Sequence, residues 1–291
     1  MYGAVLNSFT YENSGGNGAG VIILEHEIKD SEKQKIAVEI GLSETAFIKQ
    51  IDETNFDVSF FTPLCEVELC GHATIAAFFY LGLEGIIKGL NETKKVYQRT
   101  KAGVLEIEIS FKESIPQYVL MQQSEPEIFE ELEGLDVAKI ARSLNIEESL
   151  IGLDGYDIKP AIVSTGLKDI IIPVKSRDVL NSIQSDLKMI EEISVEKGVV
   201  GYHVYSMEGN HFFARNFAPA VGINEECATG TSNGALGSLL FMKKITRGIM
   251  EVIQGESMKQ KSLIFVQVSE NDHILDVRVG GKASILKIIY F

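Results

Sequence analysis

Residues Glu66 to Leu81 read EVELCGHATIAAFFYL, and this stretch decides the fold. It begins with Glu and apolar residues in alternation, which predicts a half-buried β-strand. After the CGH at residues 70–72 the run is almost wholly apolar, which predicts a helix buried on all sides. The first turn of a buried helix leaves backbone N–H groups that need a partner, and together they attract an anion. We therefore expect the chemistry at the start of this helix.

Composition narrows the class of protein. The 291 residues are 45% apolar and 23% charged, a balance typical of a globular protein, and the formal net charge is −14. This charge disfavours nucleic acid and anionic membranes as partners, so an anionic substrate would need positive potential built into its site. No apolar run approaches the roughly 18 residues of a membrane span. Three cysteines, with no secretory segment at the start, predict a cytoplasmic protein.

A second stretch repeats the first. The residues from Cys227 read CATGTSNGALGSLL and match CGHATIAAFFYL from Cys70, which places Cys227 on Cys70 and Thr231 on Thr74. Before each stretch come a strand, a loop with glycine, a strand, a helix and two strands that carry a Phe-Phe pair. The chain is therefore expected to contain two copies of one α/β unit.

We place these units at residues 1–113 and 114–291, with a last strand that could return to the first unit. Each unit is expected to wrap a curved, mostly antiparallel sheet around its own buried helix. The two helix N-termini are expected to face one cleft. The small residues at 234–238 predict that the second helix approaches another helix closely.

Local patterns add further expectations. The three glycines of GNGAG at residues 16–20 suggest a dinucleotide fingerprint, but a β-branched strand follows them instead of a helix, so no nucleotide site is expected. Ser31 is expected to cap a helix that ends at Ile40, and Asp136 to cap another. Residues 112–133 are expected to be an irregular crossover, and residues 177–193 a single helix.

Six motifs spread over nearly the whole chain resemble signatures of the PhzF family, the phenazine-biosynthesis-like proteins. They are GNGAGVIIL, SETAFI, FFTPLCEVELCGHAT, VSTGLKDIIIPV, RNFAPAVGINEECATGTSNGALG and QGESM. The resemblance implies a diaminopimelate epimerase-like α/β (α+β) fold with two pseudo-symmetric halves. It also implies isomerase or epimerase chemistry without a cofactor, on a small carboxylate-bearing substrate, by a homodimer.

The same resemblance implies the site residues. The glutamate of SETAFI, Glu44, is the expected acid/base, and His72, Glu226 and Thr231 are its expected partners. In a closed apolar cleft the pKa of Glu44 would be raised, so that it could exchange a proton near neutral pH. The helix-start residues expected to bind substrate are Gly71, Ala73, Thr74, Thr229 and Gly230.

Two alternatives stay open. Cys227 stands where the family motif has proline, and diaminopimelate epimerases and proline racemases carry a cysteine in each half. A two-cysteine racemase or epimerase using Cys70 and Cys227 is therefore possible, and helix N-termini would lower the pKa of both thiols. Glu226 replaces an aspartate of the family motif, which leaves room for a non-catalytic protein that binds a ligand or a partner.

Other cysteines and histidines are given structural roles. Cys65 is expected to pack. A zinc site of Cys65, Cys70 and His72 is not expected, because no second ligand pair has the required spacing, so we expect no metal. The histidines without a motif, expected to be structural, are His26, His203, His211 and His273.

Overall fold

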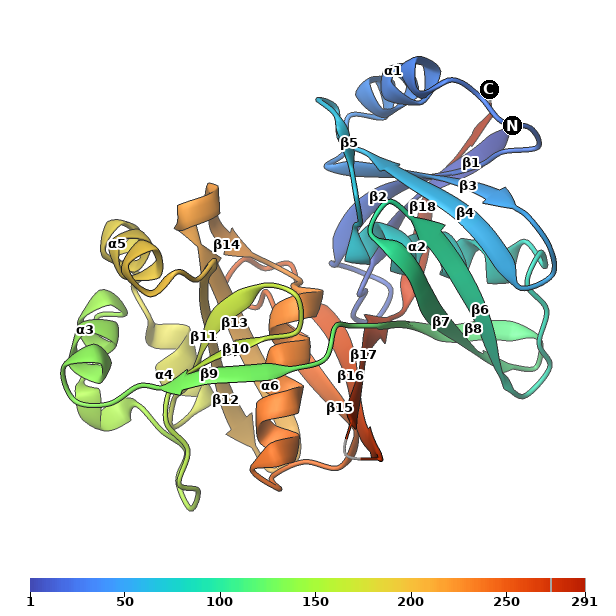
Figure 1. The fold of residues 1–291 in the computed structure, drawn as a ribbon. Coiled ribbons are helices and arrows are strands. Elements are labelled where there is room, and N and C mark those ends of the chain that lie inside the picture. Colours follow the sequence, from blue (N-terminus) through green and yellow to red (C-terminus); the bar gives the residue numbers. More distant parts are fainter. Residues whose placement is uncertain (273, 291) are drawn as a thin grey trace. The chain divides into compact units, whose positions relative to one another are not determined.

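The computed structural model describes residues 1–272 and 274–290, so His273 lies outside the described part, and the chain divides into two compact units (Figure 1). Unit 1 comprises Met1–Gln122 with Gly280–Phe291, and unit 2 comprises Gln123–Val279. The boundary expected at residue 113 falls inside a β-hairpin, whose turn uses Glu113 and Ser114 with φ of 53° and 64°. The strand after this turn pairs antiparallel with the one before it, which keeps it in unit 1.

Unit 1 is a single curved sheet with one buried helix and one covering helix. Its elements are β1 (Tyr2–Ser8), β2 (Asn17–Ile23), α1 (Asp30–Ile40), β3 (Glu44–Gln50), β4 (Asn55–Phe61), β5 (Glu66–Val67), α2 (Gly71–Leu83), β6 (Thr93–Thr100), β7 (Gly103–Lys112), β8 (Ile115–Gln122) and β18 (Ala283–Tyr290). The strands pair in the order β18–β1–β2–β3–β4–β6–β7–β8. Only β2–β3 and β4–β6 are parallel among these pairs.

Helix α2 is the helix predicted from the CGHAT stretch. Its residues from Ala73 to Gly82 are all buried. Both end strands of the sheet, β18 and β8, contact α2, as do β1, β2, β3 and β7. The sheet therefore curls around the helix, and this confirms the predicted fold class for unit 1.

Helix α1 covers the outer face of the sheet. Ile36 and Ala37 of α1 pack on Phe47 and Phe61, whose rings meet edge to face at 5.6 Å. The predicted Ser31 cap is wrong: the N-cap is Lys29, and it makes no side-chain cap bond. The acidic residues Asp30 and Glu32 in the first turn favour the helix dipole instead.

Unit 2 has the same plan. Its elements are β9 (Glu127–Glu131), α3 (Leu135–Ser143), η1 (Glu148–Leu150), β10 (Ala161–Ser164), β11 (Lys168–Pro173), α4 (Arg177–Ser182), α5 (Leu187–Lys197), β12 (Gly201–Glu208), β13 (His211–Ala218), η2 (Pro219–Val221), β14 (Ile223–Glu226), α6 (Gly230–Met242), β15 (Gly248–Gln254), β16 (Ser262–Asn271) and β17 (Ile274–Gly281). The sheet order is β9–β10–β11–β12–β13–β15–β16, and α6 contacts β10, β11, β12 and β16.

The strand directions repeat between the units. β1–β2–β3–β4–β6–β7 pair as antiparallel, parallel, antiparallel, parallel and antiparallel, and β10–β11–β12–β13–β15–β16 follow the same series. In each unit the chain forms the buried helix between the two strands of the second parallel pair: α2 comes between β4 and β6, and α6 between β13 and β15. The internal repeat read from the sequence is therefore a repeat of topology.

Unit 2 differs from the sequence expectations in local detail. The expected helix at 177–193 is two helices, α4 and α5, capped by the side chains of Ser176 and Asp186. The segment expected to be irregular contains β8 and β9. Asp136 does not cap α3, because Gly134 with φ of 54° is the N-cap. The expected close approach of α6 is made to a strand at Gly237, where a Cβ would lie 2.5 Å from Val266 of β16.

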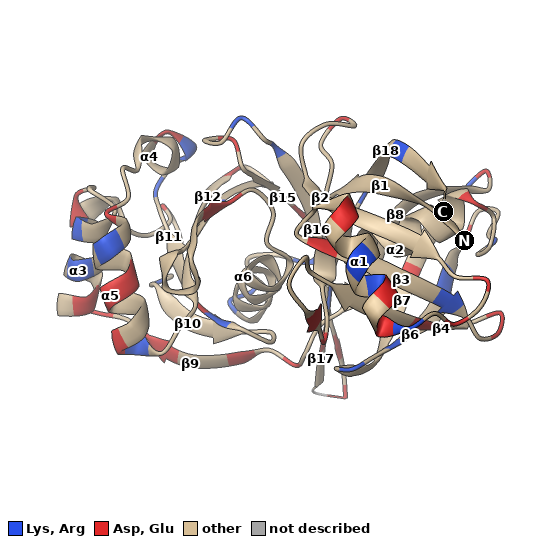
Figure 2. Cartoon of the chain, turned by 90° about the horizontal axis from the view of Figure 1, so that it is seen from above, with Lys and Arg blue, Asp and Glu red and all other residues tan. Residues whose placement is uncertain are grey.

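Charged residues of both signs share the exposed helices α1, α3 and α5 (Figure 2). Ion pairs such as Lys139–Glu196 and Lys197–Asp136 join α3 to α5. Among the described residues no helix is long and apolar enough to cross a membrane.

Candidate active site

The first site residues meet where β3 begins and α2 begins. Glu44 is the first residue of β3, and His72 lies in the first turn of α2. The Nε2 atom of His72 is 3.1 Å from Oε2 of Glu44, and these side chains are 14% and 21% exposed. Strand β3 alternates, so Glu44 shares the face of Ala46 and Ile48 while Phe47 faces α1. Sequence motifs 28 positions apart (44 and 72) are thus brought into contact by the β3–α2 packing.

The electrostatics of this pair differ from the sequence expectation. Burial by itself raises the pKa of Glu44, but the hydrogen bond and positive charge of His72 outweigh burial and leave the pKa below its ordinary value. The expected raised pKa of Glu44 is therefore wrong. Burial opposes a charged His72, yet the charges of Cys70 and Glu44 and their hydrogen bonds raise the pKa of His72 to about 10. The two shifts, a lowered pKa for Glu44 and a raised pKa for His72, favour a carboxylate beside an imidazolium.

Two more polar groups surround the imidazole. The Cys70 sulfur lies 3.4 Å from Nδ1 and 3.9 Å from Nε2 of His72, and the Ser43 hydroxyl lies 3.4 Å from Nε2. Cys70 is the N-cap residue of α2 and is 8% exposed. Donor atoms of Glu44, Cys70 and His72 all lie within 4.8 Å of one another, so these three residues could hold a metal ion.

Other expected substrate-binding residues in unit 1 are buried. Thr74 is fully buried, and its hydroxyl donates to the Cys70 carbonyl at 2.8 Å and lies 3.2 Å from Oε1 of Gln98 on β6. This arrangement fixes the first turn of α2 against the sheet. Ala73 is also fully buried, whereas Gly71 and His72 are partly exposed, so at this helix end the backbone N–H groups of Gly71 and His72 are the donors that a ligand can reach.

Unit 2 repeats this anchoring at the start of α6. Thr229 is the N-cap residue, and the Asn233 side chain donates to the Thr229 carbonyl at 2.8 Å and to Gln254 on β15 at 2.8 Å. Asn233 thus stands to Thr229 as Thr74 stands to Cys70, and Gln254 corresponds to Gln98.

This correspondence corrects the predicted register of the repeat. Cys70 caps α2, but the residue that caps α6 is Thr229, so Cys227 lies two positions before the equivalent place and Thr231 corresponds to His72. Cys227 is 7% exposed, and burial together with the Glu226 charge raises the pKa of its thiol. The lowered pKa expected for Cys227 is therefore wrong. Both findings count against the two-cysteine alternative.

The two adjacent glutamates of unit 2 have different surroundings. Glu225 receives two hydrogen bonds from the Arg215 guanidinium at 2.9 and 3.0 Å, and the Ser257 hydroxyl bonds it as well. Glu226 receives the Thr229 hydroxyl at 3.1 Å. Glu225 is thus committed to a structural ion pair, and Glu226 is the carboxylate at the helix start.

Thr231 and Gly230 follow in the first turn of α6 and are partly exposed. The Thr231 carbonyl accepts the Thr165 hydroxyl at 2.9 Å, which ties this turn to the VSTG loop after β10. The backbone beside Cys227 requires a glycine at position 255. Gly255 has φ of 83°, and a Cβ there would lie 3.0 Å from the Cys227 carbonyl oxygen and 2.4 Å from that of Gln260.

Comparison with known proteins identifies the family. Residues 6–287 match the family of phenazine biosynthesis-like proteins, PhzC-PhzF. The chain belongs to the PhzF family. A curated relative from Clostridium acetobutylicum, named an uncharacterised isomerase, is 36% identical over 293 residues that cover 97% of this chain and 94% of the relative. Membership in the PhzF family, with relatives of this kind, supports isomerase activity.

Solved structures support the same fold. A Bacillus anthracis phenazine biosynthesis protein of the PhzF family matches with a TM-score of 0.82 and 24% identity, over 99% of this chain and 98% of that chain. A probable proline racemase from Agrobacterium radiobacter matches with a TM-score of 0.64 and 10% identity, over 100% of this chain and 92% of that chain. The chain therefore has the fold that the PhzF family shares with proline racemases.

A buried polar network behind α6 was not predicted. Asn216 donates to Nδ1 of His203 at 3.3 Å, so the Nε2 of His203 carries the proton and donates to Asn233 at 3.2 Å. Asn216 also bonds Ser232, whose hydroxyl donates to Asp169 at 2.6 Å. Burial lowers the pKa of His203 to about 4 and raises that of Asp169 to about 7. His203 is thus held in a buried network whose members come from four elements, β11, β12, β13 and α6, that no local motif joins.

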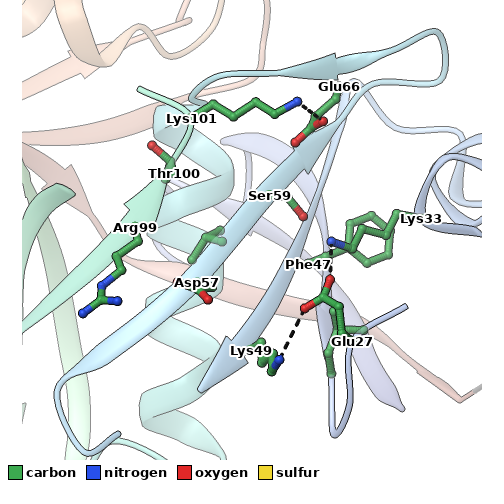
Figure 3. A pocket seen from close by; sticks show the side chains of 12 residues that line it. Glu27, Lys33, Phe47, Lys49, Asp57, Ser59, Glu66, Arg99, Thr100 and Lys101 are labelled. Carbon is green, nitrogen blue, oxygen red and sulfur yellow. Dashed lines mark hydrogen bonds and ion pairs between the residues drawn. The ribbon is translucent and has the colours of Figure 1, made fainter. Parts of the chain in front are cut away.

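A pocket of about 340 Å³ lies on the other face of the unit 1 sheet (Figure 3). Phe47 and Lys49 line it from β3, so the strand alternation places it away from Glu44. Ion pairs occupy much of its wall: Glu27 contacts Lys33 at 3.0 Å and Lys49 at 3.5 Å. This pocket is not part of the candidate active site.

Proposed function

We propose that this PhzF-family protein is a cofactor-independent isomerase that moves a proton on a small carboxylate-bearing substrate. The contact between Glu44 and His72, 3.1 Å apart at the N-terminus of α2, carries this proposal. It joins the acid/base residue of one family motif to the histidine of another. It also lies beside backbone N–H groups suited to an anion.

The roles follow from position and charge. Glu44 removes the proton from the carbon next to the substrate carboxylate and returns it to the same or another carbon. The N–H groups of Gly71 and His72 bind the carboxylate and stabilise the negative charge that develops on it. His72 holds the Glu44 carboxylate by the ion-pair contact of 3.1 Å and supplies positive charge at the centre of the reaction.

A bound anionic substrate would improve Glu44 as a base. Without a ligand, the contacts with His72, Ser43 and Cys70 keep the pKa of the Glu44 carboxylate lowered, and a weak base removes a carbon-bound proton poorly. A substrate carboxylate adds negative charge near Glu44 and displaces water from it. Both effects raise the pKa of Glu44. The base would therefore reach its working strength only in the complex.

Unit 2 residues complete the proposal. Glu226, Thr229, Gly230 and Thr231 lie at the start of α6, and we assign Glu226 and Thr231 roles in catalysis on the family resemblance. Glu226→Gln and Thr231→Val should each reduce turnover. Glu225→Gln should act mainly on stability, because Glu225 is bonded to Arg215.

The experiment is solvent deuterium incorporation. The protein is incubated in D₂O with a panel of small carboxylic and amino acids, and mass spectrometry detects exchange at carbon. Glu44→Gln should lower the exchange rate at least roughly 10²-fold, while the exposed Glu68→Gln serves as the matched control. Exchange by Glu44→Gln at the wild-type rate would refute the proposed base.

The non-catalytic alternative, the homodimer and the cytoplasmic location are separate from the proposed reaction. If panel members bind, by calorimetry, and none exchanges, the alternative of a non-catalytic ligand-binding protein replaces the enzyme. The homodimer and the cytoplasmic location remain predictions. Light scattering of the purified chain measures the first.

A further inference from the structure

Three donor atoms of different chemistry converge at the start of α2. They are a carboxylate oxygen of Glu44, the sulfur of Cys70 and a ring nitrogen of His72, all within 4.8 Å of one another. The Nε2 of His72 lies 3.1 Å from Oε2 of Glu44 and 3.9 Å from the Cys70 sulfur. Tetrahedral zinc, with bonds of about 2.0–2.3 Å, places neighbouring donor atoms roughly 3.3–3.8 Å apart. The Glu44–His72 and His72–Cys70 separations are thus close to those of a zinc site, and small side-chain rotations would bring the Cys70 sulfur, now 3.4 Å from Nδ1, round to an ion at Nε2.

The sequence does not indicate these three residues as one metal site, because Glu44 lies far along the chain from Cys70 and His72. Cys70 and His72 lie two positions apart in the sequence, but a single pair of ligand residues does not predict a zinc site. Glu44 joins them only through the packing of β3 on α2. Cys65, which sequence spacing would have offered as the third ligand, is exposed and does not belong to the group.

The position is held firmly and can be reached from solvent. Cys70 is the N-cap residue of α2 and His72 lies in its first turn, where the Thr74 hydroxyl donates to the Cys70 carbonyl at 2.8 Å. Glu44 begins a strand inside the sheet. The side chains of His72 and Glu44 are 14% and 21% exposed, so an ion could enter and keep a water molecule as its fourth ligand.

The donor set selects the metal. One sulfur, one imidazole nitrogen and one carboxylate suit zinc and related thiophilic ions. Magnesium and calcium prefer six or more oxygen ligands, and this cluster offers one carboxylate.

We propose that Glu44, Cys70 and His72 bind one Zn²⁺ per chain and that the bound ion inhibits the enzyme. On binding, the ion displaces the protons of the His72 ring and the Cys70 thiol into solvent, and it takes the lone pair with which Glu44 accepts a proton. A protein that needs no metal would thus be switched off by one. The inhibition rests on the proposed function, whereas the binding does not.

Cobalt reports the binding without any substrate. Co²⁺ titrated into the metal-free protein should give one equivalent of a tetrahedral site, with strong visible bands and a near-ultraviolet thiolate charge-transfer band. Zn²⁺ should displace it. Cys70→Ala should lose the charge-transfer band, and Cys65→Ser should keep it. A band that survives Cys70→Ala, or the weak spectrum of octahedral cobalt, would overturn the site.

The other two ligands are tested by affinity. His72→Asn and Glu44→Gln should each weaken Zn²⁺ binding at least about tenfold, because loss of even a supporting outer residue costs that much. Circular dichroism of each variant checks that it is folded. Unchanged affinity in both variants would refute the three-ligand site.

Activity gives the separate inhibition test. One equivalent of Zn²⁺ should abolish deuterium exchange, a chelator should restore it, and Mg²⁺ at the same concentration should have no effect. Full exchange with the zinc site occupied would refute the inhibition. If the wild type shows no exchange with any compound, the proposed function fails, and the cobalt spectrum still decides the metal site.

Discussion

His72 approaches Glu44 to 3.1 Å while its other ring nitrogen lies 3.4 Å from the Cys70 sulfur. One imidazole thus sits between a carboxylate and a thiol, and it is the only group of the three that can donate to both neighbours. The charge state of the site depends on this histidine, which explains why Glu44 does not have the raised pKa that burial alone would give.

His72→Asn should slow deuterium exchange less than Glu44→Gln. Asparagine keeps a hydrogen-bond donor for Glu44 but removes the positive charge, so we expect a loss of roughly 10- to 100-fold against at least about 10²-fold for the glutamate. His26→Asn, at an exposed position, is the control. A larger loss in His72→Asn than in Glu44→Gln would make the histidine the principal proton carrier.

Gly255→Ala should destabilise unit 2 more than Gly198→Ala does. Both glycines have left-handed backbones, with φ of 83° and 64°, so alanine costs about 1–2 kcal/mol at each. Only at Gly255 would the new Cβ also meet the Cys227 and Gln260 carbonyl oxygens, which should add roughly 1–3 kcal/mol. Urea unfolding of both variants measures the difference. Equal losses would show that the backbone moves aside at Gly255.

The three cysteines should react with a thiol reagent at very different rates. Cys65 is exposed and should react first at pH 7.5. Cys227 is buried and the pKa of its thiol is raised, so its thiolate is scarce and it should react last. Mass spectrometry of the modified peptides gives the order. Rapid modification of Cys227 would revive the two-cysteine alternative.

Asp169→Asn should change how stability depends on pH. Burial raises the pKa of Asp169 from 3.8 to about 7, so between these values the folded state holds a proton that the unfolded chain has lost. The free energy of unfolding therefore falls as pH rises through that window. His203, with its pKa lowered from 6.5 to about 4, acts in the opposite direction, since the unfolded chain binds the extra proton.

Removing Asp169 leaves the contribution of His203. The urea midpoint of Asp169→Asn should therefore rise more between pH 4.5 and 7 than that of the wild type. Asp157→Asn, at an exposed site, should follow the wild type. Identical pH profiles for Asp169→Asn and the wild type would show that the carboxyl is not protonated in the folded protein.

Much of the fold could be read from the sequence because the repeat constrains it. An apolar helix that begins at CGHAT is stable only when it is buried, and its repetition along the chain predicts two sheets, each wrapped around one helix. Glu44 and His72 were found from their motifs. Local sequence patterns predicted the elements less well. The prolines Pro116 and Pro126 predicted an irregular segment, but β8 and β9 form there because the neighbouring strands β7 and β10 provide pairing partners.

The finer geometry could not be read in this way. The predicted register of the repeat was wrong by two residues because it aligned the two cysteines, Cys70 and Cys227. The start of α6 is instead set by the hydrogen bonds that Asn233 donates to Thr229 and to Gln254. The sign of the Glu44 pKa shift required the distance to His72. The network of Asp169, Ser232 and His203 joins separate strands and a helix, and no pattern along the chain marks it.

Strand β18 pairs with β1, Tyr290 opposite Tyr2 and Ala283 opposite Ser8, while unit 2 lies between them in the sequence. A ribosome therefore releases all of unit 2 before unit 1 has its edge strand. The nascent chain would hold an unpaired β1 edge during that interval, a surface open to chaperones and to other chains. Unit 2 should reach its folded state first during synthesis, although unit 1 is made first.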